Sequence, residues 1–294
     1  MAAIPTSWQR RWQDYLFVLP ALALIGAVVY GSIVYTAYVS AFRWPGFGPN
    51  KTFVGLANYI QLLRDQTFRA TLANTAVFVL VFVTLQLAVG LLMAISVKVA
   101  RFGATVCSVV FFLPVVLAHA VTAQVFNQIL SNDGEVNAIL RALGLPGLAL
   151  GWLSDPDIAL FSLAAVNLWT WAGFAFLFYF AALSQISPEI YEAAIIDGAG
   201  AARIVFRIVI PLLMPTHAAL VMLGIIGSIK TFELVYLTTA GGPASATEFM
   251  TTYIVQKTIF EFNAGYGAAI SMALIVIALA LTVAQIVLLR PTKA

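Results

Sequence analysis

Polar and aromatic residues inside long apolar runs are the side chains of this sequence best placed to do chemistry. Polar groups are costly in an apolar span, so they usually face a bundle interior or a water-filled path. The candidates for such a path are Asn167, Trp169, Trp171, Ser228, Lys230, Thr231, Glu233, Tyr266 and Ser271. Amides and hydroxyls can hydrogen-bond a solute rich in hydroxyl groups, such as a sugar, and aromatic faces can pack against its C–H surfaces.

Each of these residues also has a simpler interpretation. Serine, threonine and asparagine join neighbouring membrane helices by hydrogen bonds worth roughly 0.6–2 kcal/mol, and tryptophan often lies in an interfacial belt. Lys230 and Glu233 are three residues apart and could pair with each other on one helix. A role in packing and a role in solute binding are therefore both open for any single residue of the set.

The sequence gives little support for an enzyme. No glycine is followed by lysine, so no Walker A loop is present to bind ATP phosphates. His119 and His217 lack the spacing of metal ligands, which favours packing or interface roles for both. We therefore expect no catalytic residue, no metal site and no cofactor bound by this chain.

Composition assigns the chain to the integral membrane proteins. Of its 294 residues, 62% are hydrophobic and only 9% are charged, and the mean hydropathy is +0.98. Soluble domains are close to half apolar and a quarter charged. The net charge of +3 is small and the basic residues are scattered, so nothing indicates nucleic-acid binding. The one cysteine, Cys107, excludes a disulfide within the chain.

Six apolar segments are long enough to cross a bilayer, because about 20 residues span its hydrocarbon. We predict an all-α membrane protein with six transmembrane helices, a single domain over residues 1–294, and both termini on the same side. The predicted spans cover residues 16–42, 72–98, 104–130, 158–184, 208–232 and 264–289.

The segment between the fourth and fifth spans is the most charged part of the interior of the sequence. Ser187 suits a helix N-cap and Pro188 the first helical position. Gly198 suits the left-handed residue that closes a helix. A second short helical run follows, with Arg203 and Arg207 one turn apart. These features predict a short helix and a glycine turn at the membrane surface, exposed to a partner.

The same segment resembles the EAA loop of the permease subunits of bacterial ABC importers. The family pattern is E-A-A, two residues, D-G-A, and then I-x-x-P, which Ile208 and Pro211 complete here. The first part is matched by Glu192, Ala193, Ala194, Asp197, Gly198 and Ala199. The resemblance implies the type I importer permease fold, with residues 188–202 as a cytoplasmic coupling helix that docks on an ATPase subunit.

Other stretches resemble the sugar-type permeases of this superfamily, the relatives of the maltose and glycerol-phosphate importers. They include FVGLANYIQLL, GEVNAILRALGL and LTTAGGP, which occur in the family's order along most of the chain. The chain departs from the maltose permease because it lacks that protein's extra N-terminal spans and large periplasmic insertion. The resemblance therefore implies a sugar or sugar derivative as the solute, but does not single out maltose.

The resemblance also implies the other subunits of a transport complex. A second homologous permease would pair with this one on a dimer of ATPase subunits, which bind the ATP and Mg, and an extracytoplasmic solute-binding protein would deliver the solute. The complex would lie in the bacterial inner membrane, with both termini of this chain in the cytoplasm. Three alternatives stay open: an ABC permease for an amino acid, phosphate or oligopeptide, a stand-alone secondary transporter, and a membrane-embedded enzyme.

Orientation is the first testable expectation. The side of the predicted termini carries eight basic residues and the opposite loops carry six, a weak positive-inside bias. A cytoplasmic reporter fused after Ala294 should be active, and a reporter that works only outside the cell should be silent. The reverse result would overturn the predicted orientation.

Overall fold

The computed structural model describes residues 10–100 and 103–288, and nearly all of its regular structure is helical. The only strands in these ranges are β1 (Phe42–Arg43) and β2 (Thr52–Phe53), which pair antiparallel. The helices, in chain order, are α1 (Arg10–Ile25), η1 (Gly26–Tyr30), α2 (Gly31–Ser40), α3 (Ala57–Arg64), α4 (Gln66–Ala100), α5 (Ala104–Val116), α6 (His119–Ile129), α7 (Glu135–Ala142), η2 (Pro146–Leu148), α8 (Ala159–Ser184), α9 (Pro188–Ile196), α10 (Ala201–Ile204), η3 (Val205–Val209), α11 (Ile210–Leu212), α12 (Met214–Ile229), α13 (Glu233–Thr238), α14 (Met250–Val255), η4 (Gln256–Phe260) and α15 (Ala264–Leu288). The predicted all-α class is confirmed.

All six predicted spans correspond to helical segments that are long and apolar enough to cross a membrane. Four are single helical segments: Phe17–Ser40, Gln66–Val99, Ala159–Ser184 and Ala264–Val287. The other two are bent pairs, α5 with α6 at 94° and Ala201–Leu212 with α12 at 67°. The described residues therefore contain four such helices, or six if each bent pair counts as one span.

The two bends have local causes. Between α5 and α6, Leu117 and Ala118 are extended, with ψ of 138° and 135°, and Pro114 lies in the last turn of α5. In the fifth span the helix bends at Leu213, and Pro215 has no N–H to donate to the carbonyl of Pro211 four residues earlier. The segment predicted as the fifth span, residues 208–232, is therefore bent rather than a single straight helix.

The chain divides by its contacts into two compact units. One comprises Met1–Arg64 with Ile254–Ile275, and the other comprises Asp65–Tyr253 with Val276–Ala294. In the first unit, the side-chain amide of Asn58 donates to the carbonyls of Ser40 and Phe42, and the N–H of Gly265 donates to the carbonyl of Trp44. These bonds hold the β1–β2 loop between the end of α2 and the start of α15.

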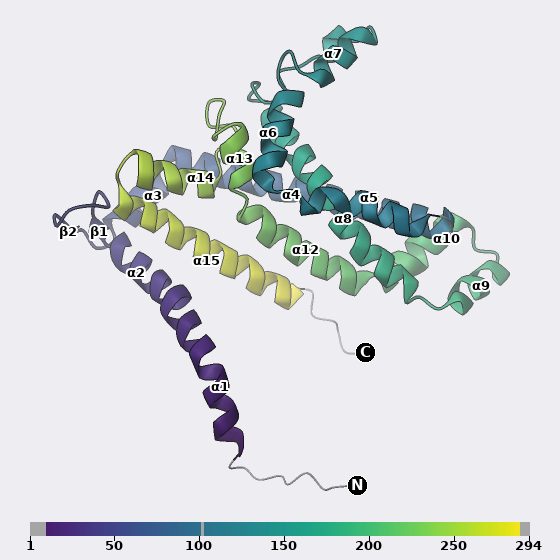
Figure 1. Cartoon of the computed structure of the whole chain (residues 1–294), viewed down its shortest axis with the longest axis horizontal. Coiled ribbons are helices and arrows are strands. Elements are labelled where there is room, and N and C mark those ends of the chain that lie inside the picture. The colour runs from purple at the N-terminus through teal and green to yellow at the C-terminus, as the bar shows by residue number, and fades with distance from the viewer. Residues whose placement is uncertain (1–9, 101–102, 289–294) are drawn as a thin grey trace. The chain divides into compact units, whose positions relative to one another are not determined.

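The second unit is a bundle in which α4 and α8 form the central pair, with α5 against α8 and α12 against α4 (Figure 1). Small residues let these helices approach closely, as is common in membranes. A Cβ on Gly90 would lie 2.6 Å from the Cβ of Ala175. A Cβ on Gly173 would overlap the carbonyl of Phe111, so α5 and α8 can pack only without a side chain there.

Gly173 gives a test of this packing. Gly173→Ala should destabilise the protein by about 1–3 kcal/mol or more, because the obstacle is backbone and cannot move aside as a side chain could. Gly26→Ala is the matched control, since nothing lies within 4 Å of a Cβ at that helical glycine. Thermal unfolding in detergent should show a lower transition temperature for Gly173→Ala alone. Equal stability of the two variants would contradict the close α5–α8 contact.

Candidate functional site

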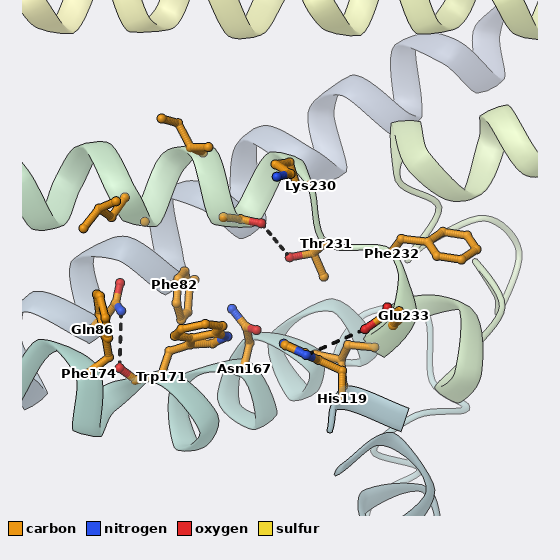
Figure 2. Close-up of a pocket in the computed structure, with 15 residues that line it drawn as sticks. Phe82, Gln86, His119, Asn167, Trp171, Phe174, Lys230, Thr231, Phe232 and Glu233 are labelled. Carbon is orange, nitrogen blue, oxygen red and sulfur yellow. Dashed lines mark hydrogen bonds and ion pairs between the residues drawn. The ribbon is translucent and has the colours of Figure 1, made fainter. Parts of the chain in front are cut away.

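The second unit contains a cavity of about 630 Å³ that is bounded mainly by α8 and α12 (Figure 2). Volumes of this order are typical of small-molecule sites. The residues that line it are Phe82, Gln86, His119, Asn167, Trp171, Phe174, Leu223, Gly224, Ile226, Gly227, Lys230, Thr231, Phe232, Glu233 and Leu234.

Both a broken span and a helix end open onto this cavity. α12 ends at Ile229, the backbone is not helical from Lys230 to Phe232, and α13 begins at Glu233. His119 is the first residue of α6, directly after the extended break in the third span. Irregular backbone at membrane depth is tolerated only where it is buried in protein or lines a water-filled space. Both breaks border the cavity, as this constraint requires of irregular backbone within a membrane span.

Neutral polar groups reach the cavity from two helices and from the break that follows α12. Asn167 of α8 is buried apart from its face on the cavity, and Thr231 donates its hydroxyl to the carbonyl of Gly227 at 3.1 Å. Gln86 of α4 donates to the carbonyl of Trp171 at 3.4 Å, while its Oε1 has no hydrogen-bond partner among the described residues. That oxygen faces Gly224, where a Cβ would lie only 3.1 Å away.

Aromatic faces supply much of the remaining wall. Trp171 and Phe174 lie one turn apart on α8, with ring centroids 5.8 Å apart, and Phe82 joins them from α4. Phe232, in the non-helical break, stacks on Tyr236 at 5.0 Å. The cavity thus combines amides and a hydroxyl with several aromatic rings, which is the mixture that binds sugars.

Three ionisable side chains also line the cavity. Nδ1 of His119 lies 3.7 Å from Oε2 of Glu233, which joins the first residues of α6 and α13 (Figure 2). Lys230 is exposed and has no ion pair with any described residue. The Lys230–Glu233 pair considered from the sequence is therefore wrong, because α12 ends at Ile229, before both residues, and Glu233 contacts His119.

Of the nine residues proposed for the solute path, five line the cavity: Asn167, Trp171, Lys230, Thr231 and Glu233. Ser228 is buried and donates to the carbonyl of Gly224, and Trp169 packs against Phe126 on another side of α8. Tyr266 and Ser271 belong to the other compact unit and are not among the lining residues.

Sequence reasoning missed several cavity residues. His119 was expected to have a packing or interface role, yet it lines the cavity. The sequence signal that could have found it is Pro114, five residues earlier in the same span. Gln86 is a polar residue in the middle of the second span, yet it was not among the candidates for the solute path. Phe82, Phe174 and Phe232 carry no signal in an apolar sequence, because only the fold decides which phenylalanine faces inward.

A second candidate site lies in the turn between α8 and the fifth span. α9 closes with a Schellman arrangement, in which the N–H of Ala199 donates to the carbonyl of Ala194 and the N–H of Gly198 to that of Ile195. Gly198 has φ of +74°, which confirms the left-handed cap expected from the sequence. Nothing lies within 4 Å of a Cβ at Gly198, so its backbone angle, and not crowding, requires glycine.

The exposed side of this turn carries the motif residues. Glu192, Ala193, Asp197 and Gly198 are exposed, and so is Ile196, at 85%. The opposite side packs inward through buried Ala194 and through Tyr191, and burial raises the pKa of the Tyr191 phenol. The turn therefore presents its motif to the outside while it is anchored to the bundle.

One local expectation about this turn needs correction: Ser187 occupies the N-cap position, but its side chain makes no capping hydrogen bond. The segment 188–202 is interrupted as expected, because α9 ends at Ile196 and the second helical run, α10, starts at Ala201. The positive φ of Gly198 forces this interruption, since an α-helix cannot continue through a left-handed residue.

Comparison with protein families matches the chain to the binding-protein-dependent transport system inner membrane component family over residues 86–290. The matched region contains the turn at Gly198 and every residue that lines the cavity except Phe82.

Full-length relatives have the same character. The chain is 33% identical to the probable ABC transporter permease protein YurN of Bacillus subtilis, over 97% of this chain and 98% of that protein. It is 36% identical to the probable ABC transporter permease protein PH1215 of Pyrococcus horikoshii, over 90% and 91%. It is 32% identical to the lactose transport system permease protein LacF of Rhizobium radiobacter, over all of both chains.

Solved structures agree on the fold. A chain of a bacterial ABC transporter involved in import of the acidic polysaccharide alginate superposes with a TM-score of 0.79 at 21% identity, covering 97% of this chain and 98% of that one. The same kind of transporter, in complex with an alginate pentasaccharide-bound periplasmic protein, gives a TM-score of 0.80 at 21% identity, covering 96% and 95%.

Proposed function

Because the chain belongs to the family of binding-protein-dependent transport system inner membrane components, we propose that it carries a sugar or sugar derivative inward through the cavity between α8 and α12. The observation that carries this proposal is the meeting of polar groups, aromatic faces and a broken span at one cavity. Such breaks at membrane depth are how transporters expose backbone and side-chain groups to a solute.

The lining chemistry favours a sugar over the other solutes that ABC permeases carry. Asn167, Thr231 and Glu233 offer acceptors, and the amide and hydroxyl groups also donate, so several hydroxyls of one solute can be satisfied together. Trp171 and Phe174 add aromatic faces. Relatives named for lactose, sn-glycerol-3-phosphate and sulfoquinovosyl glycerol support the same solute class.

The turn at Gly198 would dock on a cytoplasmic ATPase subunit. Its exposed residues include two carboxylates, Glu192 and Asp197, beside the small Ala193 and the apolar Ile196. A surface of this kind suits a cleft with an apolar floor and basic groups at its rim. ATP and Mg would bind to the ATPase subunits, and their closure would move α9 and the two helices beside it.

The remaining partners follow from this assembly. A second homologous permease would complete the solute path, and an extracytoplasmic solute-binding protein would load it. Both termini of the chain would lie in the cytoplasm of a bacterium, on the same side of the inner membrane as the ATPase. The structural neighbour bound to a periplasmic protein supports the solute-binding partner.

Two tryptophans on α8 give a matched test of the cavity. Trp171 lines it, whereas Trp169 is 45% exposed and packs against Phe126. Loss of one aromatic face should weaken solute interaction by about 0.5–1.5 kcal/mol, so Trp171→Ala should lower uptake about 2- to 10-fold. Trp169→Ala, which we expected from sequence alone to act in the path, should leave uptake near normal.

The measurement is uptake of radiolabelled lactose, sn-glycerol-3-phosphate and sulfoquinovosyl glycerol, with an amino acid, phosphate and an oligopeptide as the alternatives. Cells that lack this permease would express each variant at matched membrane levels. Permease-dependent uptake of an alternative solute in place of every sugar would overturn the proposed solute class. Equal uptake by the two tryptophan variants would remove Trp171 from the path.

Two glycines at the turn give a matched test of docking. Gly198 has φ of +74°, whereas Gly200 has φ of −72°, and neither has a neighbour within 4 Å of a Cβ. A valine at Gly198 should cost about 1–3 kcal/mol in backbone strain and rearrange the turn, while Gly200→Val should not. We expect Gly198→Val to abolish transport and to detach the ATPase or uncouple its activity, more severely than Glu192→Ala.

Co-purification of the ATPase with tagged permease, followed by its hydrolysis rate, would measure this effect. Gly200→Val should retain both. Normal attachment and normal transport in Gly198→Val would show that the turn is only a connecting loop.

A further inference from the structure

A buried hydrogen bond joins α8 and α12 on the side of the cavity nearer to α9. The hydroxyl of Tyr179 and Nδ1 of His217 lie 2.7 Å apart, and the two rings meet edge to face at a centroid distance of 5.2 Å. Tyr179 has no exposed surface, and His217 is half-buried. Neither residue lines the cavity or the exposed face of the turn, so neither role proposed above accounts for the pair.

The bond closes the hairpin that contains α9. Tyr179 lies five residues before the end of α8 at Ser184, or about 8 Å along the helix. His217 lies one turn after the bend at Leu213, and its N–H donates to the Leu213 carbonyl. The chain between the two residues includes α9, the Gly198 turn and the bent entry to α12. One hydrogen bond therefore ties the two arms that leave this turn.

Few other interactions tie these arms directly. α8 and α12 each pack mainly against α4 rather than against each other. Within residues 10–100 and 103–288, the Tyr179–His217 bond is the only side-chain hydrogen bond between α8 and α12. Leu183, Leu213 and Leu220 surround it in one apolar cluster, which also receives Tyr191 from α9.

The same two helices carry the cavity. Asn167, Trp171 and Phe174 come from α8, and Gly224, Gly227 and the Lys230 end come from α12. The rest of the lining comes from α4, α6 and α13, so a movement of α8 and α12 past these elements changes the shape of the cavity. A displacement of the α9 turn would reach the cavity through α8 and α12, because both helices lead away from that turn.

We propose that Tyr179 and His217 are positioning residues whose hydrogen bond makes α8 and α12 move as one body past α4, α6 and α13, so that movement of the α9 turn reshapes the cavity that these elements line together. This inference rests on the proposed function, because it assumes that an ATPase moves α9. It adds a specific element of coupling within the permease, distinct from the docking surface.

The test measures how fast a reagent modifies a thiol in the cavity, and not how fast the solute is transported. In a Cys107→Ser background, Leu223→Cys places a thiol at the cavity, where Leu223 is 45% exposed. The tagged permease is purified with its co-purifying ATPase and second permease and returned to liposomes. The rate at which sulfonatoethyl methanethiosulfonate modifies the thiol is then measured on the permease band, with and without ATP plus vanadate.

The parent complex should change its modification rate when ATP and vanadate trap the ATPase. Tyr179→Phe removes one hydroxyl, and His217→Leu removes the ring; each should shrink this change about 2- to 10-fold, as expected for loss of one buried hydrogen bond. His217→Asn, which places an amide atom near the position of Nδ1, should restore much of it. ATPase attachment and basal hydrolysis should persist in all three.

Tyr191→Phe is the matched control. It also removes a hydroxyl beside this cluster, but the Tyr191 hydroxyl has no hydrogen-bond partner among the described residues. It should respond as the parent does. A full response in Tyr179→Phe and His217→Leu would overturn the inference. The inference would also be overturned if these variants assembled less well but the complexes that did assemble responded normally. That result would assign the pair to stability alone. A parent complex that binds no ATPase would instead contradict the proposed function, and the inference would fall with it.

Discussion

The structure depends on one constraint: backbone groups inside a bilayer must find hydrogen-bond partners within the protein. Long helices satisfy this constraint, as α4, α8 and α15 do over most of their length. The chain departs from it at two breaks, Leu117–Ala118 and Lys230–Phe232. Both breaks place the adjoining residue, His119 or Glu233, at the cavity. The two interruptions of regular helix therefore account for both the irregular backbone and the position of the candidate site.

Close helix packing keeps the rest of the bundle rigid around these breaks. Gly90 brings α4 against Ala175 of α8, and Gly173 brings α8 against the backbone of α5. At these contacts there is no side chain that could change rotamer to absorb a displacement. α8 is therefore held on two sides, and a force on its end near α9 moves the helix as a body rather than dissipating locally. Regular packing and local irregularity thus have complementary roles.

Much of the fold was predictable from the sequence, because hydrophobic length is a strong signal. The six apolar segments, the glycine cap at Gly198 and the membrane class all follow from local composition. The bends did not, although Pro114 and Pro215 mark them, since proline in a membrane helix is also compatible with a continuous span. The division into two compact units depends on contacts between distant residues, which no local pattern reports.

The site was predictable only in part. Polar residues in a span are conspicuous, so Asn167, Thr231 and Glu233 could be found, but the sequence does not give the helix rotation that separates Trp171 from Trp169. The Lys230–Glu233 pair failed for a related reason. Spacing of three residues implies contact only within a continuous helix, and here α12 ends at Ile229, before Lys230, while α13 begins only at Glu233.

In the proposed function, the α9 turn and the cavity belong to one mechanism even though they share no residue. A permease of this kind would use ATP hydrolysis by its partner only through movement, so each cycle would convert displacement of the exposed turn into a changed cavity wall. α8 leads into the α9 turn, α12 follows it after the bend at Leu213, and both helices line the cavity. The change in the cavity would then depend on how these two helices are joined. The edge-to-face Tyr179–His217 contact joins them one turn beyond the bend, which is why we assign the transmission of this movement to that pair.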